Sequence, residues 1–144
     1  MMWDEVIPAW LNLLESDATL TGVLGTDADG FVPIYPASAG RPVRVPSVEY
    51  YFVSDTESEL FNPIRVQVDY WAKGIGRAAV IERRVRLLTH RDTSRELGAH
   101  RMWTRYLDSR SHDYPADPGV VHRSMDVLFE PLRHRFQNTD GGGS

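Results

Sequence analysis

Residues 63–73 read Pro-Ile-Arg-Val-Gln-Val-Asp-Tyr-Trp-Ala-Lys and carry the clearest structural pattern of the chain. Ile64, Val66, Val68 and Tyr70 alternate with mostly polar neighbours. Such a period of two is typical of a β-strand that buries one face. The stretch therefore predicts a strand whose apolar face contributes to a core.

A second strand precedes this one. Residues 45–54 also alternate, and they place Val48, Tyr50 and Phe52 on one face. The segment between the two strands begins with the acidic residues 55–59, Asp-Thr-Glu-Ser-Glu, which are typical of a solvated loop. The two strands and their loop are therefore expected to form a long antiparallel hairpin.

Helical periodicity appears twice along the chain. Apolar side chains recur three or four positions apart in residues 3–14, and again in residues 76–90. Between them, Ser16 or Asp17 can cap a short helical turn that Gly25 can end. We therefore expect two main helices and one short turn of helix.

Three further segments are predicted strands. Residues 31–35 are interrupted by Pro33, which favours a position at the edge of a sheet. Residues 99–108 and 120–130 alternate and predict two more strands. The polar residues 109–119, with two prolines, are expected to form the loop between them.

The order helix, strand, strand, strand, helix, strand, strand predicts an α+β fold. We expect a mostly antiparallel sheet of four to five strands, with two main helices packed on it. The 144 residues suit one domain, which we place at residues 1–136. Residues 137–144 are rich in glycine and are expected to be a flexible tail.

Composition excludes several classes of function. The chain has no cysteine, which excludes disulfide scaffolds, cysteine-ligated metals and cysteine nucleophiles. A net charge of −4 predicts no general attraction to nucleic acid or to an anionic membrane. No apolar run approaches the length of about 20 residues that spans a bilayer, and the acidic N-terminus is unlike a signal peptide. We therefore expect a protein made in a cytoplasm and without a membrane partner.

One motif suggests an enzyme. Residues 74–79, Gly-Ile-Gly-Arg-Ala-Ala, match G-x-G-x-x-A, follow a predicted strand and open a predicted helix. That is the context of a dinucleotide-binding turn. The preceding strand is half polar, however, whereas parallel strands in such folds are apolar on both faces. A strand-to-helix turn that uses Gly74 and Gly76 is therefore favoured, and a small nucleotide-binding enzyme is the alternative.

Other candidate chemistry rests on histidine and arginine. The five histidines are ten or twelve residues apart, so none share a helical face as metal-binding pairs do; they are His90, His100, His112, His122 and His134. Arg83, Arg84 and Arg86 form a basic cluster that could contact phosphates, which gives a nucleic-acid-binding module as a third hypothesis. More commonly such a cluster forms a solvated helix face or pairs with nearby carboxylates, for which Glu82 and Glu96 are candidates. We expect no metal ion, no cofactor and no catalytic residues.

A set of short motifs follows one another in a recognisable order. A helix leads into residues 17–20, Asp-Ala-Thr-Leu, and a strand ends at residues 35–36, Tyr-Pro. The second hairpin strand carries residues 66–71, Val-Gln-Val-Asp-Tyr-Trp, and a final strand closes the sheet. Over most of residues 3–135 the chain thereby resembles the tail terminator and tail completion proteins of long-tailed bacteriophages.

The resemblance implies a structural virion protein that is not an enzyme. Such proteins form a ring, commonly a hexamer, that caps the finished tail tube, stops its polymerisation and offers a surface for head docking. The implied partners are other copies of this chain, the tail tube protein, a head–neck connector protein and double-stranded DNA that passes through the lumen without sequence-specific contact. The implied location is the tail or neck of the virion, after assembly in the host cytoplasm. A head-side neck connector or adaptor is the alternative within this class.

The size of the domain suits a ring of six. A domain of 144 residues has a radius of gyration near 15 Å and a diameter of roughly 37 Å. Six touching spheres leave a hole of about the same width, which passes a DNA duplex about 20 Å across. A closed ring needs a contact between two different patches. We expect the hairpin loop to supply one patch, through these interaction residues: Asp55, Glu57, Glu59, Leu60 and Phe61.

Overall fold

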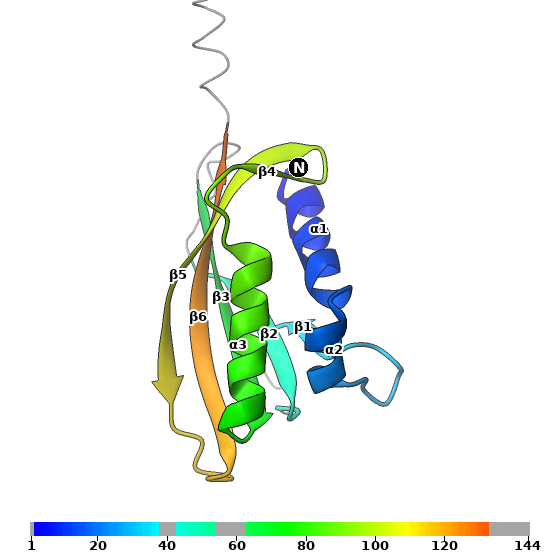
Figure 1. The fold of residues 1–144 in the computed structure, drawn as a ribbon, viewed down its shortest axis with the longest axis vertical. Coiled ribbons are helices and arrows are strands. Elements are labelled where there is room, and N and C mark those ends of the chain that lie inside the picture. The colour runs from blue at the N-terminus through cyan, green and yellow to red at the C-terminus, as the bar shows by residue number, and fades with distance from the viewer. Residues whose placement is uncertain (1, 38–42, 54–62, 133–144) are drawn as a thin grey trace, which may run out of the picture.

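In the computed structural model of the protein, the described residues form three helices that lie on one face of a six-stranded sheet (Figure 1). The structure describes residues 2–37, 43–53 and 63–132. In chain order the elements are α1 (Trp3–Glu15), α2 (Ala18–Leu24), β1 (Ile34–Pro36), β2 (Ser47–Phe52), β3 (Ile64–Lys73), α3 (Ile75–Thr89), β4 (Arg95–Leu97), β5 (His100–His112) and β6 (Val120–Pro131).

The sheet has the strand order β1-β2-β3-β6-β5-β4. β3 lies between β2 and β6 and is antiparallel to both. Its register with β6 runs without a break from Ile64 opposite Phe129 to Lys73 opposite Val120. The short edge strand β1 pairs in parallel with β2. The expected α+β class, the mostly antiparallel sheet and the long hairpin are thus confirmed.

Alternation along β3 places every second side chain against the helices, as the sequence predicts. Ile64, Val66, Val68 and Tyr70 are all buried, and they meet apolar residues of β6 and of the helices. Trp10 of α1 sits at the centre of this core. Its partners are Phe129, with ring centroids 5.3 Å apart, Tyr50, with centroids 6.2 Å apart, and the Thr89 hydroxyl, which accepts a 3.0 Å hydrogen bond from the indole Nε1.

The sheet has six strands in the described residues, whereas four to five were expected. β4 has three residues, too few for alternation to be detected, and it joins β5 through a tight turn. Gly98 occupies that turn with φ +64°, a conformation that favours glycine. A β-carbon there would lie 3.0 Å from the Glu5 β-carbon of α1, so the turn also needs glycine for close packing.

The boundary of β5 also differs from the expectation. Residues 109–119 were expected to be a loop, but β5 continues to His112 and pairs with β6 as far as His122. A bulge between Tyr106 and Asp108 shifts the register within this pairing. This part of β5 is mostly exposed, so its polar residues resemble a loop in sequence while the backbone pairs with β6.

The helix ends agree with the sequence. Asp17 caps α2 by accepting a 2.9 Å hydrogen bond from the backbone N–H of Leu20, and Gly25 follows the helix with φ +70°. No helix in the described ranges is both long and apolar enough to cross a membrane. The expected interaction residues 55–61 and the expected tail 137–144 lie outside the described residues. The division into residues 1–136 and 137–144 stays a prediction.

Candidate functional site

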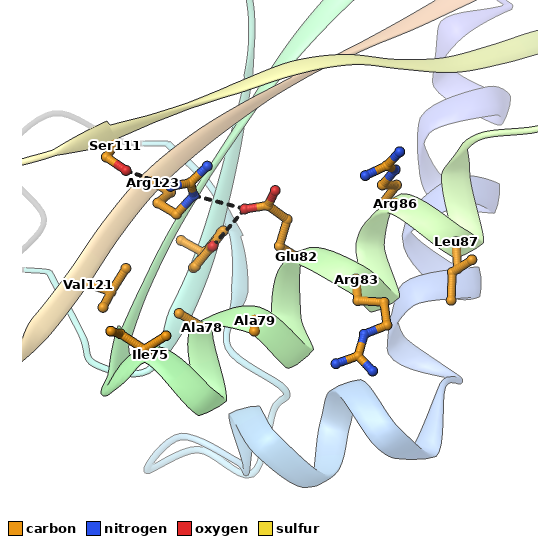
Figure 2. Close-up of a pocket in the computed structure, with 11 residues that line it drawn as sticks. Ile75, Ala78, Ala79, Glu82, Arg83, Arg86, Leu87, Ser111, Val121 and Arg123 are labelled. Carbon is orange, nitrogen blue, oxygen red and sulfur yellow. Dashed lines mark hydrogen bonds and ion pairs between the residues drawn. The ribbon is translucent and has the colours of Figure 1, made fainter.

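A cavity of about 780 Å³ lies between α3 and the paired strands β5 and β6 (Figure 2). It exists because α1 and α2 pack beside α3 on one side, while β5 lies on the other side of α3 (Figure 1). We call it the α3 groove. Its lining residues come from four elements and are Tyr70, Ile75, Ala78, Ala79, Glu82, Arg83, Arg86, Leu87, Ser111, Val121 and Arg123.

The floor of the α3 groove centres on the carboxylate of Glu82. One carboxylate oxygen accepts hydrogen bonds from the Tyr70 hydroxyl and from Arg123 Nε, each 2.9 Å long. The other accepts from the Tyr106 hydroxyl at 3.3 Å and the Ser109 hydroxyl at 3.2 Å. The four donors come from β3, β5 and β6, so this one side chain of α3 binds three strands together (Figure 2 shows the Arg123 contact).

Arg123 completes the polar floor. Its terminal nitrogens donate to the Ser111 hydroxyl at 2.5 Å and to the Ser109 hydroxyl at 2.7 Å. Burial raises the pKa of Glu82, but the hydrogen bond from Tyr70 and the charge of Arg123 outweigh burial, so the pKa lies below its ordinary value. Burial, with the hydrogen bond to Glu82, raises the pKa of Tyr70. At neutral pH the carboxylate is therefore charged and the phenol protonated, an arrangement suited to holding structure and not to proton transfer.

The rim of the α3 groove is apolar and basic. Ile75 and Leu87 are 80% and 58% exposed, large values for aliphatic side chains. Arg83 and Arg86 lie beside them on the helix (Figure 2). The Arg86 guanidinium also sits 4.8 Å from the centroid of the Tyr106 ring. An exposed rim of aliphatic and arginine side chains is typical of a surface that meets another protein.

A second cluster lies on the sheet face that the helices leave uncovered. His112 of β5 is directly opposite His122 of β6, and their ring centroids are 4.6 Å apart. The His122 ring also stacks on Trp71, with centroids 4.4 Å apart. His112 Nε2 lies 2.7 Å from the Ser124 hydroxyl oxygen. Burial lowers the pKa of His122 and the charge of His112 lowers it further, against an opposing effect of Asp69.

Sequence spacing alone did not bring these two histidines together. They are ten residues apart, and only the pairing of β5 with β6 makes them neighbours. An interpretation of residues 112–122 as the turn of a β-hairpin would have placed the two histidines opposite each other. Within the described ranges, no group of three or more histidine or acidic residues is arranged to hold a metal ion.

The same uncovered face carries a network of ion pairs and hydrogen bonds. Arg110 of β5 contacts both carboxylate oxygens of Asp126, at 3.2 and 3.4 Å, and the side-chain carbonyl of Gln67, at 3.1 Å. The Gln67 amide donates to Asp69 at 2.9 Å, and the Ser124 hydroxyl also donates to Asp69. Strands β5, β6 and β3 are thereby joined by side chains as well as by backbone.

The glycine motif at residues 74–79 lies in an antiparallel setting. Gly74 caps α3 with φ +86°, and its N–H donates to the Gly119 carbonyl at 3.0 Å. The strand before it, β3, is antiparallel to both neighbours, whereas a dinucleotide-binding turn belongs to a parallel β-α-β unit. A β-carbon at Gly76 would meet nothing within 4 Å, so no close approach requires glycine there. The topology therefore does not provide the setting that the nucleotide-binding alternative needs.

The arginine cluster divides among three surroundings. Arg84 forms two hydrogen bonds with Asp17, at 2.6 and 3.0 Å, which join α3 to the start of α2. Arg86 packs over an aromatic ring and Arg83 lines the α3 groove. Of the two common roles expected of this cluster, a solvated face or pairing with a carboxylate, Arg84 takes the second, but its partner is Asp17 and not Glu82 or Glu96. Glu82 instead forms an ion pair with Arg123. A carboxylate oxygen of Glu96 lies 3.9 Å from a guanidinium nitrogen of Arg101.

The chain is thus an α+β domain in which helices cover one face of a mostly antiparallel sheet. The structure is similar to a chain described as "Virion of native gene transfer agent (GTA) particle", with a TM-score of 0.64 and 13% sequence identity. The alignment covers 90% of this chain and 96% of that chain, so the two share their fold over nearly their whole lengths.

A second solved structure is the Dit (gp 19.1) protein of SPP1, described as a paradigm of the hub adsorption apparatus in phages that infect Gram-positive hosts. Its TM-score is 0.29, with 20% identity over 62% of this chain and 41% of that chain, and it carries no argument here. No protein-family profile and no curated protein sequence matches this chain.

Proposed function

We propose that this chain is a structural virion protein of a long-tailed bacteriophage or a related particle. Within that class we propose a tail terminator: a ring, most simply a hexamer, that caps the tail tube, stops its polymerisation and forms the surface on which the head docks. The observation that carries the proposal is the fold shared with a chain of a gene transfer agent virion over 90% of the present chain. The motifs at residues 17–20, 35–36 and 66–71 support the same class.

The surface of the domain is suited to assembly. β4 pairs with only the first three residues of β5, so in the described residues Leu107–His112 has β6 on one side and no strand on the other. Such an open edge can accept a neighbouring chain. The α3 groove adjoins this edge, because Ser111 of β5 is one of its lining residues, and the expected interaction residues 55–61 are the candidate for a second, separate patch. Two different patches on one subunit are what a head-to-tail ring requires.

The polar cluster at the floor of the groove also suits a structural role. Its carboxylate has four hydrogen-bond donors, and its pKa lies below the ordinary value. A general acid or base would instead need a pKa near the working pH. The proposed partners are further copies of this chain, the tail tube protein and a head–neck connector protein. DNA would pass through the lumen without sequence-specific contact, in a virion assembled in the host cytoplasm.

Electron microscopy combined with native mass measurement tests the proposal. The protein is imaged alone, mixed with purified tail tubes, and mixed with DNA-filled heads that lack tails. A terminator is expected to form rings with a DNA-sized hole, alone or at tube ends, and to cap the tubes. Binding to heads but not to tubes would favour a head-side connector instead. A protein that remains monomeric and ignores both structures would contradict the proposed class.

A further inference from the structure

The α3 groove carries a positive charge on a negative protein. Three of its lining residues are arginines and Glu82 is the one carboxylate among them, which leaves a net charge of +2. The Glu82 charge is already compensated by its four donors. The whole chain has a net charge of −4. The groove is therefore a local basic surface, bordered by the exposed Ile75 and Leu87.

The complement of this surface is present in the same sequence. Residues 55–61 read Asp-Thr-Glu-Ser-Glu-Leu-Phe, with three carboxylates, no basic residue and two adjacent large apolar side chains. Carboxylates suit Arg83 and Arg86, and the Leu-Phe pair suits the aliphatic rim. The cavity of about 780 Å³ is of the size that takes several side chains.

The Tyr70 end of the groove floor is too far away for this segment of the same copy. The Arg86 and Leu87 end lies closer to the start of β3, because Trp10 contacts both Thr89 at the end of α3 and Phe129, which is opposite Ile64. Phe52 is opposite Val66, and the Val53 N–H bonds to the Arg65 carbonyl, so the segment leaves the sheet at the start of β3. Tyr70, which marks the groove floor, is six residues further along β3, or about 20 Å away along the strand. Nine residues, 54–62, connect Val53 to Pro63. Because this connection must return to the sheet, it can extend by only half its length, which is at most about 16 Å.

We infer that the α3 groove receives residues 55–61 of a second copy of this chain, and that this is the head-to-tail contact of the ring. The inference rests on the proposed ring function and names the two surfaces that close the ring. The carboxylates of the segment meet Arg83 and Arg86, and its Leu60-Phe61 pair packs on one of the two aliphatic side chains of the rim, which are about 18 Å apart along α3. Because the two surfaces lie at different places on each subunit, the contact repeats from one copy to the next.

Disulfide trapping tests the contact directly, because the natural chain has no cysteine. Leu60→Cys and Ala79→Cys are made as separate full-length variants with tags of different mass, mixed and oxidised. Ala79 is exposed and lines the groove near its floor. We expect a cross-linked pair that contains one copy of each variant. Ala99→Cys, at an exposed position outside the groove, is the matched control and is expected to give none.

Charge reversal tests the electrostatic part of the contact. Arg83→Glu is expected to weaken self-association or tube capping by about tenfold, since it places like charges together. Arg77→Glu makes the same change at an exposed position of α3 that does not line the groove, and it is expected to assemble normally. Adding Glu57→Arg and Glu59→Arg to Arg83→Glu is expected to restore assembly. Circular dichroism checks that each variant is folded.

The outcomes separate this contact from the proposed function. Rings that cap tubes but neither cross-link through Ala79→Cys nor respond to Arg83→Glu would overturn the contact and leave the tail terminator proposal standing. Cross-linked head-to-tail assemblies that ignore tubes would support the contact and count against the terminator function. A disulfide within one chain of the Leu60→Cys, Ala79→Cys double variant, or a protein monomeric under all conditions, would overturn the contact.

Discussion

Glu82 of α3 and Arg123 of β6 form an ion pair between the helix layer and the sheet, with Arg123 Nε 2.9 Å from Glu82 Oε1. Their side chains are 21% and 30% exposed, so the pair is largely shielded from solvent. Both partners have further hydrogen bonds to residues of the sheet. The pair therefore positions α3, and with it both the floor and the rim of the α3 groove.

Glu82→Gln is expected to lower the free energy of unfolding by about 2 kcal/mol. The substitution leaves Arg123 without its counter-charge in a partly buried site, and partial exposure makes the loss smaller than for a fully buried pair. Urea denaturation measures the change. Glu96→Gln removes a carboxylate whose side chain is 69% exposed and is expected to change the free energy by less than about 0.5 kcal/mol. Equal losses in the two variants would contradict the role given to Glu82.

The same pair predicts how stability changes in acid. The pKa of Glu82 in the folded protein lies below the ordinary value of 4.5, so the unfolded chain binds the proton more readily. Its contribution is complete above pH 4.5 and is lost as the pH falls through the folded pKa. Denaturation curves at a series of acidic pH values give the free energy of unfolding at each pH. This free energy should decrease more steeply with falling pH for the natural protein than for Glu82→Gln. If the free energy of unfolding changed with pH equally in both proteins, Glu82 would not be the cause of the pH dependence.

Asp17 is expected to stabilise the fold in two separable ways. It caps α2 through Leu20 and pairs with Arg84 of α3. Asp17→Asn keeps a good cap but removes the charge, whereas Asp17→Ala removes both. We expect Asp17→Ala to cost about 1 kcal/mol more than Asp17→Asn in thermal or urea unfolding. A negligible difference between the variants would show that the cap contributes little.

Thr89→Val tests a hydrogen bond at the centre of the core. Thr89 is fully buried, and its hydroxyl accepts the 3.0 Å hydrogen bond from Trp10 Nε1. The nearly isosteric substitution leaves the buried indole N–H without this partner, which should cost about 1–3 kcal/mol. Thr93→Val, at an exposed position, is the control and is expected to change stability by less than about 0.5 kcal/mol. Near-ultraviolet circular dichroism should report the altered tryptophan environment.

His122 predicts a second pH effect in a different range. Burial lowers its folded pKa below the ordinary value of 6.5, so the unfolded chain binds more protons between the two values. Its contribution is present above pH 6.5 and decreases as the pH falls toward the folded pKa. His122→Asn should therefore flatten the dependence of stability on pH in this range. Proton NMR of the imidazole should show His122 titrating below pH 6.5, and titration above that value would contradict the prediction.

Deletion of residues 55–59 is expected to leave the subunit folded but to weaken ring formation or tube capping. The acidic segment lies between β2 and β3, which pair from Ser47 opposite Trp71 to Phe52 opposite Val66. Circular dichroism and unfolding curves measure the fold, and mass measurement with electron microscopy measures assembly. Normal rings and normal tube capping by the deletion variant would rule out an interaction role for this segment.

Much of the fold could be predicted from local pattern. β3 begins and ends where the alternation of residues 64–73 places it, because one buried face imposes a period of two. The α2 cap at Asp17 was predictable because a capping side chain bonds to the backbone only three residues away. Strand β4 and the second half of β5 were not predicted, since a three-residue strand and an exposed polar edge carry little hydrophobic pattern.

The strands with one buried face and the main helices follow from contacts within a few residues, so local sequence encodes them, and their order along the chain indicates the α+β class. The tertiary fold brings Glu82 to Arg123, 41 residues away, and brings His112 to His122 across a hairpin. It also decided that Arg84 binds Asp17, 67 residues away, while Arg83 faces the α3 groove. Such partners depend on strand register and on how α3 crosses the sheet, and these are set by the packing of the whole core.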